Sequence, residues 1–438
     1  MNTYATIPHQ PASAPPSGRA PVDTGRVAIV DPYSTGEHFA AAFAGHGFEA
    51  VAVLTMAPPP EWPGRLRSEQ YVAVIDYDGN SADVARKLKQ LQVGHVLAGS
   101  ESGVPAADRL ASQLGVPGND PSGSAARRDK FAMACALARA GLPHARTMRA
   151  FSVGHAEKCA YELDGWPLVV KPADSAASDR VAIARSAADV SDLAADILNA
   201  SNLFGRPNET VIVQQYLSGE QYAVNTVSRG GVHRIVEVWH DRRTDLGDGR
   251  MIYDRMDLLA PGDTRVPILS RYVRACLDAL GIVHGPAHSE VMLTARGPVL
   301  IETGARLQGG DSVALMREAI GTSQTDAAVL AALDSAAAHA ARASNPYSYA
   351  PVTQMFLQAP AGGRIAQDSI GKLMRIAGVA GFVHTPAPGA PVRQTVDLLS
   401  SPATVYLTAR TTRQIDQAYA AVRELESTGF YQSAHEER

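Results

Sequence analysis

Cysteine is scarce in this chain of 438 residues. The three cysteines, Cys135, Cys159 and Cys276, lie far apart, with no Cys-x-x-Cys pair and no histidine pair beside them. This spacing supports neither a disulfide framework nor a zinc site. Long apolar runs are lacking as well, because Arg, Asp and Gly interrupt every stretch before the roughly 20 residues that a membrane helix requires. We therefore expect a cytoplasmic protein with no membrane partner.

A large excess of charge is also missing. The 40 Lys and Arg residues against 44 Asp and Glu residues leave a net charge of −4, which argues against nucleic acid as a partner. A composition of 45% hydrophobic and 19% charged residues is typical of globular proteins, and the length suffices for roughly two to four packed units. Residues 1–24 are rich in Pro, Ala and Ser and lack the apolar segment of an export signal, so we expect a disordered tail.

Short apolar runs alternate with helical patterns over residues 25–120. This alternation predicts an open parallel α/β domain, with strands at 26–30, 49–54, 71–75 and 95–98. The loop after the first strand lacks G-x-G-x-x-G, the fingerprint of dinucleotide-binding domains. NAD is therefore not an expected cofactor.

Hairpin-connected strands dominate the middle of the chain and predict an α+β core over residues 121–345. A helix over 124–140, capped by Ser124, leads into it, and a lid subdomain is expected at about 145–215. A mixed α+β subdomain is expected over residues 346–438. The strands expected in the core are 168–171, 181–184, 210–215, 222–227, 234–239, 289–293 and 299–302.

One predicted hairpin carries two glutamates that would face each other. Its strands flank Ala295-Arg-Gly297, a three-residue turn with Gly where positive φ is tolerated. If the turn is centred on its middle residue, Glu290 pairs with Glu302 and Met292 with Leu300. Like charges directly opposed destabilise a sheet, so we expect a Mg²⁺ ion there, with Mn²⁺ as an alternative. The other interpretation is an exposed hairpin face whose charges favour solubility.

A lysine followed by a small-residue loop predicts a phosphate site. Strand 168–171 ends in Lys171, and the amides of loop 173–180 could fold over phosphates that the lysine neutralises. The spacing is not that of a P-loop. A second lysine, Lys130, lies in the predicted helix. Each lysine could instead be an ordinary solvated side chain. The strand, tight loop and strand of residues 211–225 would suit adenine and ribose.

Four features follow one another along the chain: Lys130, Val-Val-Lys171-Pro with its loop, Gln-Gln-Tyr-Leu-Ser-Gly-Glu-Gln-Tyr, and the paired glutamates with a trailing arginine. In this order they resemble the ATP-grasp superfamily. The resemblance covers roughly residues 94–310. Within the superfamily the chain is most similar to amino-acid ligases of the dipeptide-synthetase kind, through Gly99-Ser-Glu-Ser-Gly103, Glu302-x-Gly-Ala-Arg306 and Val238-Trp-His. The resemblance implies an ATP-grasp fold with an N-terminal open parallel α/β domain, a two-lobed ATP-binding core and a C-terminal mixed α+β lobe.

The resemblance also implies roles for individual residues. Glu290 and Glu302 would hold the metal, while Arg306 and Lys171 would act on the transferring phosphoryl group. Arg306 could instead be a structural partner of Glu302, four residues away. Gly304 and Gln221 depart from the Asn and Glu that many ATP-grasp enzymes have there. The candidates for binding ATP are Lys130, Lys171, Ser175, Ser178, Gln214, Gln215, Tyr216, Leu217, Glu220 and Gln221. The candidates for substrate recognition, each with an ordinary structural role as the alternative, are Glu101, His240, Arg255, Arg306 and Gly309.

The predicted function is ATP-dependent carboxylate–amine ligation. An acyl phosphate would react with an amine to give an amide, with ADP and phosphate released. The resemblance implies small-molecule substrates, namely amino acids in a dipeptide or natural-product pathway, and a homodimer. Carboxylation of the biotin-carboxylase kind and a non-catalytic nucleotide-binding module stay as alternatives.

Overall fold

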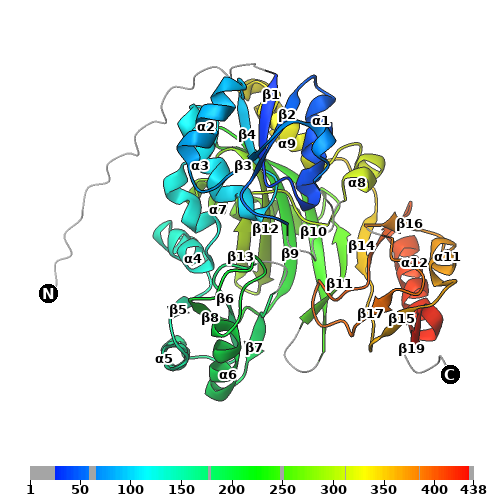
Figure 1. Cartoon of the computed structure of the whole chain (residues 1–438). Coiled ribbons are helices and arrows are strands. Elements are labelled where there is room, and N and C mark those ends of the chain that lie inside the picture. Colours follow the sequence, from blue (N-terminus) through cyan, green and yellow to red (C-terminus); the bar gives the residue numbers. More distant parts are fainter. Residues whose placement is uncertain are drawn as a thin grey trace.

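The N-terminal domain is a four-stranded parallel sheet with helices packed against it, at the top of Figure 1. The computed structural model describes residues 25–58, 66–175, 179–246, 251–310, 312–383 and 385–433. The sheet order is β3-β2-β1-β4, and the first strand lies between the second and fourth in parallel register. Its elements are β1 (Arg26–Val30), η1 (Ser34–His38), α1 (Phe39–Ala44), β2 (Glu49–Leu54), η2 (Ser68–Gln70), β3 (Tyr71–Asp76), α2 (Ser81–Gln90), β4 (His95–Ala98), η3 (Glu101–Gly103) and α3 (Val104–Leu114).

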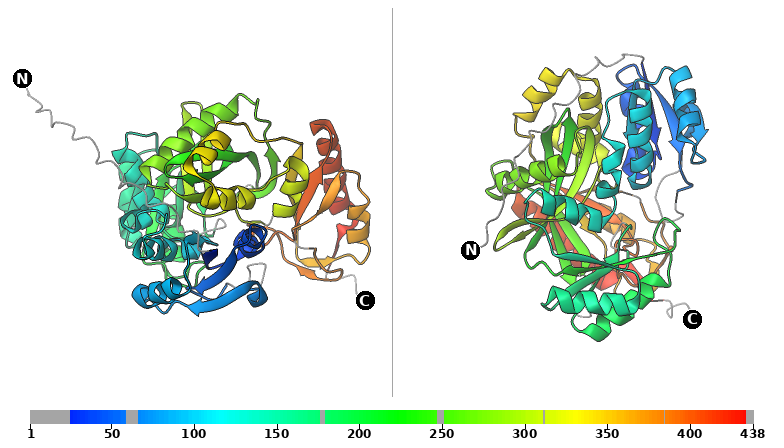
Figure 2. Two further views of the ribbon diagram at one scale, coloured as in Figure 1. Left: turned by 90° about the horizontal axis from the view of Figure 1, so that it is seen from above. Right: turned by 90° about the vertical axis from the view of Figure 1, so that its left-hand side faces the viewer.

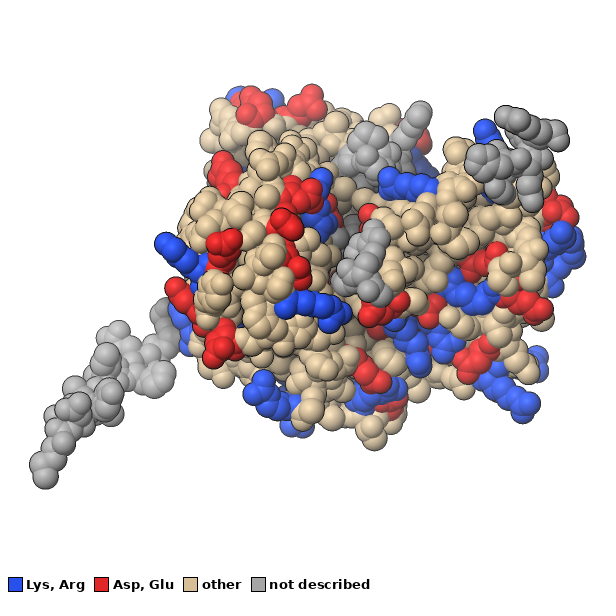
Figure 3. Space-filling model, turned by 90° about the horizontal axis from the view of Figure 1, so that it is seen from below, with Lys and Arg blue, Asp and Glu red and all other residues tan. Residues whose placement is uncertain are grey.

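The lid is a separate four-stranded antiparallel sheet with two helices on one side. Its strand order is β5-β8-β6-β7, and its elements are β5 (Thr147–Ala150), α5 (Val153–Leu163), β6 (Leu168–Pro172), β7 (Ala182–Ala184), α6 (Ala187–Leu198) and β8 (Val211–Gln215). Figures 1 and 2 place the lid and the N-terminal sheet at opposite ends of the central sheet. Viewed from below, acidic and basic side chains are intermixed over the visible face (Figure 3).

An eight-stranded sheet runs through the middle of the molecule and into the C-terminal lobe, in the order β13-β12-β9-β10-β11-β14-β18-β16. The C-terminal strands therefore extend the central sheet. The central elements are β9 (Glu220–Arg229), β10 (Val232–Asp245), β11 (Met251–Leu258), α7 (Arg265–Ala279), β12 (Gly285–Thr294), β13 (Gly297–Gly304), α8 (Val313–Ile320), α9 (Gln324–Leu333) and α10 (Ala336–Ala343). The C-terminal elements are β14 (Val352–Phe356), β15 (Gly363–Ile365), α11 (Ser369–Met374), β16 (Val379–Phe382), β17 (Pro391–Val392), β18 (Thr404–Thr408), α12 (Thr412–Leu425), η5 (Glu426–Phe430) and β19 (Tyr431–Ser433).

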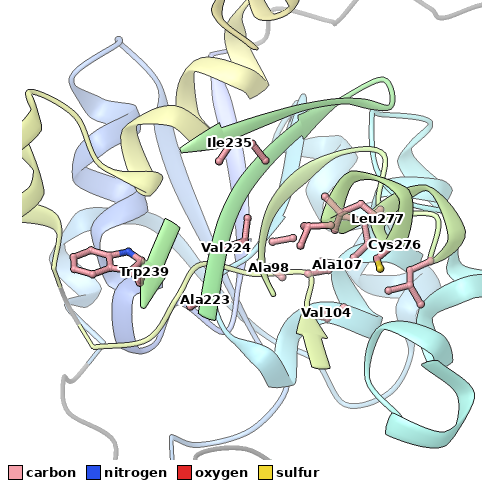
Figure 4. Packing of buried hydrophobic residues seen from close by; sticks show 14 of the residues in the cluster. Ala98, Val104, Ala107, Ala223, Val224, Ile235, Trp239, Cys276 and Leu277 are labelled. Carbon is pink, nitrogen blue, oxygen red and sulfur yellow. The ribbon is translucent and has the colours of Figure 1, made fainter. Parts of the chain in front are cut away.

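The N-terminal domain and the central sheet share their hydrophobic core. Figure 4 shows Ala98, Val104 and Ala107 of the N-terminal domain in one buried cluster with Val224 of β9 and Leu277 of α7. Packing of this density resists rearrangement, because each side chain is held by many contacts. The expected combination of α/β and α+β parts is confirmed. Among the described residues, no helix is long and apolar enough to cross a membrane.

The helix expected over 124–140 is wrong at its start. Residues Pro121–Arg127 form a 3₁₀ helix, η4, and the α-helix, α4, covers only Lys130–Arg139. The Ser124 hydroxyl donates to buried Asp108 and does not cap the helix. Asp129 is the N-cap, and its side chain accepts from the Ala132 amide. Lys130 is thereby the first residue of the helix.

Candidate functional site

A cleft of about 570 Å³ lies between the lid and the central sheet. Both lysines and both glutamates singled out in the sequence line it. Its wall also contains most of the expected nucleotide-binding residues, together with side chains of the β10–β11 hairpin. The polar lining residues are Lys130, Lys171, Ser175, Asp179, Gln214, Gln215, Tyr216, Glu220, Gln221, His240, Asp241, Arg242, Arg243, Tyr253, Asp254, Glu290 and Glu302.

The two glutamates are opposite each other in the β12–β13 hairpin, as expected, but a bulge brings them there. The turn has two residues, since Thr294 pairs with Gly297, and this register pairs Met292 with Val299, so the expected pairing with Leu300 is wrong. The register shifts by one residue between Glu290 and Val291, which makes Ile301 the extra residue and pairs Glu290 with Glu302. Bulges next to active sites commonly redirect side chains in this way.

Glu290 is surrounded by donors. Its Oε2 accepts a 2.9 Å hydrogen bond from the Gln221 amide, while Arg243 and His288 lie 3.9 and 3.7 Å from its oxygens. Burial opposes the charge, but the neighbouring His288 and Arg243 side chains outweigh it and lower the pKa of Glu290 to about 2. Gln221, which stands where many ATP-grasp enzymes have Glu, therefore holds a carboxylate in this structure.

The two lysines have opposite electrostatic environments. Lys130 Nζ lies 2.9 Å from Glu302 Oε2 and donates to the Ser175 carbonyl at 3.0 Å. Burial opposes its charge, but Glu302 prevails and raises the pKa of Lys130. Lys171 is equally buried, and burial together with the neighbouring Lys130 lowers the pKa of Lys171 to about 8. An incoming anion would therefore stabilise the charged form of Lys171 more than that of Lys130.

The end of the cleft beneath the lid is formed by the β8–β9 connection. Tyr216 and Leu217 lie in this connection, and the Gln215 amide nitrogen donates to the Arg146 carbonyl. The Gln214 side chain donates to Thr147, so this side chain is occupied within the lid. Glu220 lies at the start of β9 and is more than half exposed. These positions suit the purine and ribose roles expected for them.

The loop after Lys171 is described in part. Ser175 donates through its hydroxyl to Asp179 at 2.6 Å, and its carbonyl contacts Lys130. Ser178 lies outside the described residues, as do Ala176 and Ala177.

Arg306 is held by a residue that lies far from it in the sequence. Its Nε lies 2.7 Å from Glu101 Oε2, and Arg128 lies 3.0 Å from the other oxygen of Glu101. Burial opposes the charge on Glu101, but Arg306 and Arg128 lower its pKa. Glu302 is paired with Lys130, so Arg306 is not simply its helical-spacing partner.

The glycine at position 304 makes room for this arrangement. A Cβ atom on Gly304 would lie 2.5 Å from Glu101 Oε2 and 3.2 Å from Arg306 Nε. A side chain at 304 and the Glu101 carboxylate thus compete for the same space. An Asn at this position would therefore require the Glu101 carboxylate to move.

Of the remaining substrate candidates, Arg255 and Gly309 are not among the residues that line the first cleft, whereas His240 is. Arg255 is paired with Asp257 at 3.1 Å and with Asp416 at 2.8 Å, in a second cavity of about 300 Å³. His240 lines both cavities, and its ring stacks on Tyr222 at 4.8 Å. Gly309 lies beside Ser34 of η1.

Sequence reasoning missed the β10–β11 hairpin. The sequence predicted no strand between residues 239 and 289, but β10 continues to Asp245 and buries Asp241. Apolar residues at Ile252, Met256 and Leu258 gave an alternating signal for β11, and the bulge opposite Arg242 interrupts it. This hairpin brings Arg243 into the cleft.

The donor set of the cleft fits Mg²⁺ better than a soft metal. Glu290 and Glu302 offer carboxylate oxygens, which Mg²⁺ prefers, and it usually takes only one or two from protein before phosphates and water complete its shell. Among the residues that the structure describes, no three His, Cys, Asp or Glu side chains converge as metal ligands. A zinc-type cage is therefore not seen in this part of the chain.

An antiparallel sheet and a lid that enclose lysines and paired glutamates define a nucleotide-binding enzyme of the ATP-grasp class. Residues 165–314 match the ATP-grasp domain. Dapdiamide A synthase of Enterobacter agglomerans is 30% identical over 416 residues, which cover 92% of this chain and 96% of that protein. The chain belongs to the ATP-grasp family, and the resemblance seen in the sequence is confirmed.

Solved structures agree on the fold. The L-amino acid ligase from Bacillus licheniformis superposes with a TM-score of 0.71 at 17% identity, covering 92% of this chain and 97% of that one. The biotin carboxylase domain of the Hydrogenobacter thermophilus 2-oxoglutarate carboxylase, in complex with MgADP, ADP and bicarbonate, gives 0.61 at 14% identity, with coverage of 93% and 90%. At such identities the likeness extends to the fold alone.

Proposed function

We propose that this chain is an ATP-dependent carboxylate–amine ligase that joins amino acids or close relatives of them. The observation that carries the proposal is the facing pair Glu290 and Glu302 in one cleft with the buried lysines Lys130 and Lys171. Dapdiamide A synthase, whose name denotes an amide product, is similar along nearly the whole chain. That relative favours ligation over carboxylation and over a module without catalysis.

The chemistry proceeds in two steps. An oxygen of the substrate carboxylate forms a bond to the γ-phosphorus of ATP, the β–γ P–O bond breaks, and ADP leaves. The amine then forms a C–N bond to the acyl carbon, the C–O bond to phosphate breaks, and the amine loses a proton. No protein nucleophile is required, so the task of the protein is to position the reactants and to neutralise charge.

We assign roles in this scheme to the two glutamates and the two lysines of the cleft and to Arg306. Glu290 and Glu302 would hold Mg²⁺, which when bound neutralises phosphate oxygens. Lys171, whose charged form is disfavoured by burial and by the neighbouring Lys130, would bind the phosphates together with Lys130. Arg306, held by Glu101, would stabilise the negative charge on the group in transfer.

The acyl phosphate must be protected from water. The lid contacts the central block, which comprises the N-terminal domain, the central sheet and the helices packed on them. The Ser175 carbonyl accepts a hydrogen bond from Lys130, and Asp174 pairs with Arg128 at 2.6 Å. Lys130 and Ser175 also line the cleft. Closure of the lid over the nucleotide would exclude water during the lifetime of the intermediate.

Amino-acid-dependent release of ADP tests the proposal. The purified chain is incubated with Mg-ATP and pairs of amino acids, and ADP is measured together with the mass of the product. Ligation predicts ADP release that needs both substrates and yields an amide lighter by one water than their sum. Dependence on bicarbonate alone, or tight ATP binding without turnover for any pair, would contradict it. Glu302→Gln is the inactive control.

A further inference from the structure

A second β-bulge brings an arginine to the metal end of the cleft. In the β10–β11 hairpin Arg242 pairs with Arg255, but Arg243 pairs with Tyr253, so Asp254 is an extra residue. The bulge changes the direction of the strand at this point. As a result Arg243 lines the same cleft as the carboxylate pair.

Arg243 is held firmly in this position. Its Nε and Nη2 donate to Asp241 Oδ2 at 3.1 and 2.9 Å, and its guanidinium lies 3.8 Å from the centre of the Tyr253 ring. Asp241 is 5% exposed, and the Arg243 side chain is 14% exposed. An ordered, partly desolvated guanidinium has already lost most of its rotamer freedom, so it binds a ligand at low entropic cost.

The position of Arg243 relative to Glu290 is informative. The 3.9 Å between Arg243 Nη2 and Glu290 Oε2 is longer than a hydrogen bond. The guanidinium therefore lies within ion-pair distance of a candidate metal ligand without a hydrogen bond to it, and Glu290 accepts a hydrogen bond from Gln221. Phosphate oxygens that share a metal ion with Glu290 would come within reach of Arg243.

We propose that Arg243 binds the γ-phosphoryl end of the nucleotide and that Asp241 positions it. This inference rests on the proposed function, because it needs a triphosphate in the cleft. A planar guanidinium offers two parallel donors to a phosphate, which an ammonium cannot do. Arg243 then contacts the group in transfer from the β10–β11 hairpin, whereas Lys171 contacts the phosphates from the lid.

Equilibrium binding without any acceptor tests the inference. The dissociation constants of Mg-AMP-PNP, a non-hydrolysable triphosphate, and of Mg-ADP are measured for the wild-type chain and for Arg243→Gln. We expect the variant to bind the triphosphate about tenfold more weakly and the diphosphate nearly as well as the wild type, because only the triphosphate carries the contacted group. Arg317→Gln removes a comparable Arg–Asp pair on the surface of α8 and should leave both constants unchanged.

Two further variants distinguish loss of the phosphate contact from loss of structure. Arg243→Lys keeps the charge in the cleft and should lose affinity for the triphosphate selectively but less. Asp241→Asn should also reduce the selectivity for the triphosphate, because Asp241 positions Arg243. Equal weakening of both nucleotides, or unchanged binding of the triphosphate by a folded variant, would overturn the inference.

The outcome is separable from that of the proposed function. If the wild-type chain binds nucleotide but releases no ADP with any amino acid, ligation fails while the selectivity of Arg243→Gln can still be measured. If ligation is observed and Arg243→Gln only raises the KM of the carboxylate substrate, the function stands and Arg243 is not a phosphate ligand.

Discussion

The N-terminal domain and the lid are attached to the central sheet by different forces. Val27, Ile29 and Leu97 of the N-terminal domain lie in one buried cluster with Val236 of β10 and Leu307, which follows β13. The buried cluster of the lid consists entirely of residues between 148 and 213. Described contacts of the lid with the block include an ion pair and a hydrogen bond. Apolar packing thus joins the N-terminal domain to the central sheet, and polar contacts contribute to the attachment of the lid.

This difference divides the candidate site into two halves. Glu290, Glu302 and Arg306, with its partner Glu101, stand on the block that shares a core. Lys171 and the end of the cleft proposed to hold the purine belong to the lid. On the proposed function, the lid would bring Lys171 and the nucleotide base to the carboxylates of the block, which would suit an enzyme that must admit ATP and then exclude water.

The largest expected effect comes from the fixed half. Glu302→Gln removes one carboxylate of the pair and keeps the size of the side chain. Loss of several kcal/mol of charge stabilisation should lower kcat about 10³-fold. The rate of ADP release measures this, with thermal unfolding as the control for folding. A variant that stays fully active would remove the basis for the metal assignment.

A matched pair of leucines tests the comparison itself. Leu97→Ala creates a cavity in the core that the N-terminal domain shares with the block, and Leu163→Ala creates one in the lid. Each should cost about 3 kcal/mol. Hydrogen exchange should rise throughout the block for Leu97→Ala, but only within residues 147–215 for Leu163→Ala. If both variants loosen the whole chain alike, the lid is not an independent unit.

Arg128 links the two halves, since it pairs with Glu101 of the block and Asp174 of the lid. Its guanidinium also lies 4.9 Å from the Phe204 ring of the lid. Arg128→Gln should raise the KM for ATP about tenfold, equivalent to about 1.4 kcal/mol, and should expose the lid to limited proteolysis. The exposed Arg139, changed to Gln in the control, should have neither effect. Unchanged proteolysis would argue against Arg128 as the link.

The smallest expected effect is the pH dependence of the lid lysine. Burial and Lys130 lower the pKa of Lys171 to about 8, against the opposing charges of Glu302 and Glu290. Lys171 is charged below this pH and neutral above it, so kcat/KM for ATP should fall about fourfold between pH 7 and 8.5. Lys171→Arg, whose guanidinium stays charged, should lose this fall. The same fall in the arginine variant would assign it to another group.

The sequence predicted much of the fold, and its errors have local causes. Ser124 was a reasonable helix cap by residue type, but Asp108, sixteen residues earlier, takes its hydroxyl. The register of the β12–β13 hairpin was predicted from a three-residue turn, whereas a two-residue turn and the bulge at Ile301 together produce the same pairing of glutamates. Turn length and bulges depend on neighbouring strands, which periodicity does not reveal.

The sequence by itself determined what lies close along the chain: the strand that ends in Lys171, the small-residue loop behind it, and two glutamates joined by one short turn. Tertiary structure decided the rest. Only folding brings Glu101 to Arg306, 205 residues away, Lys130 to Glu302, and Arg243 beside Glu290. Contacts within a hairpin follow from local geometry, but an ion pair between distant segments depends on how sheets and domains pack, and single-sequence patterns carry no record of that packing.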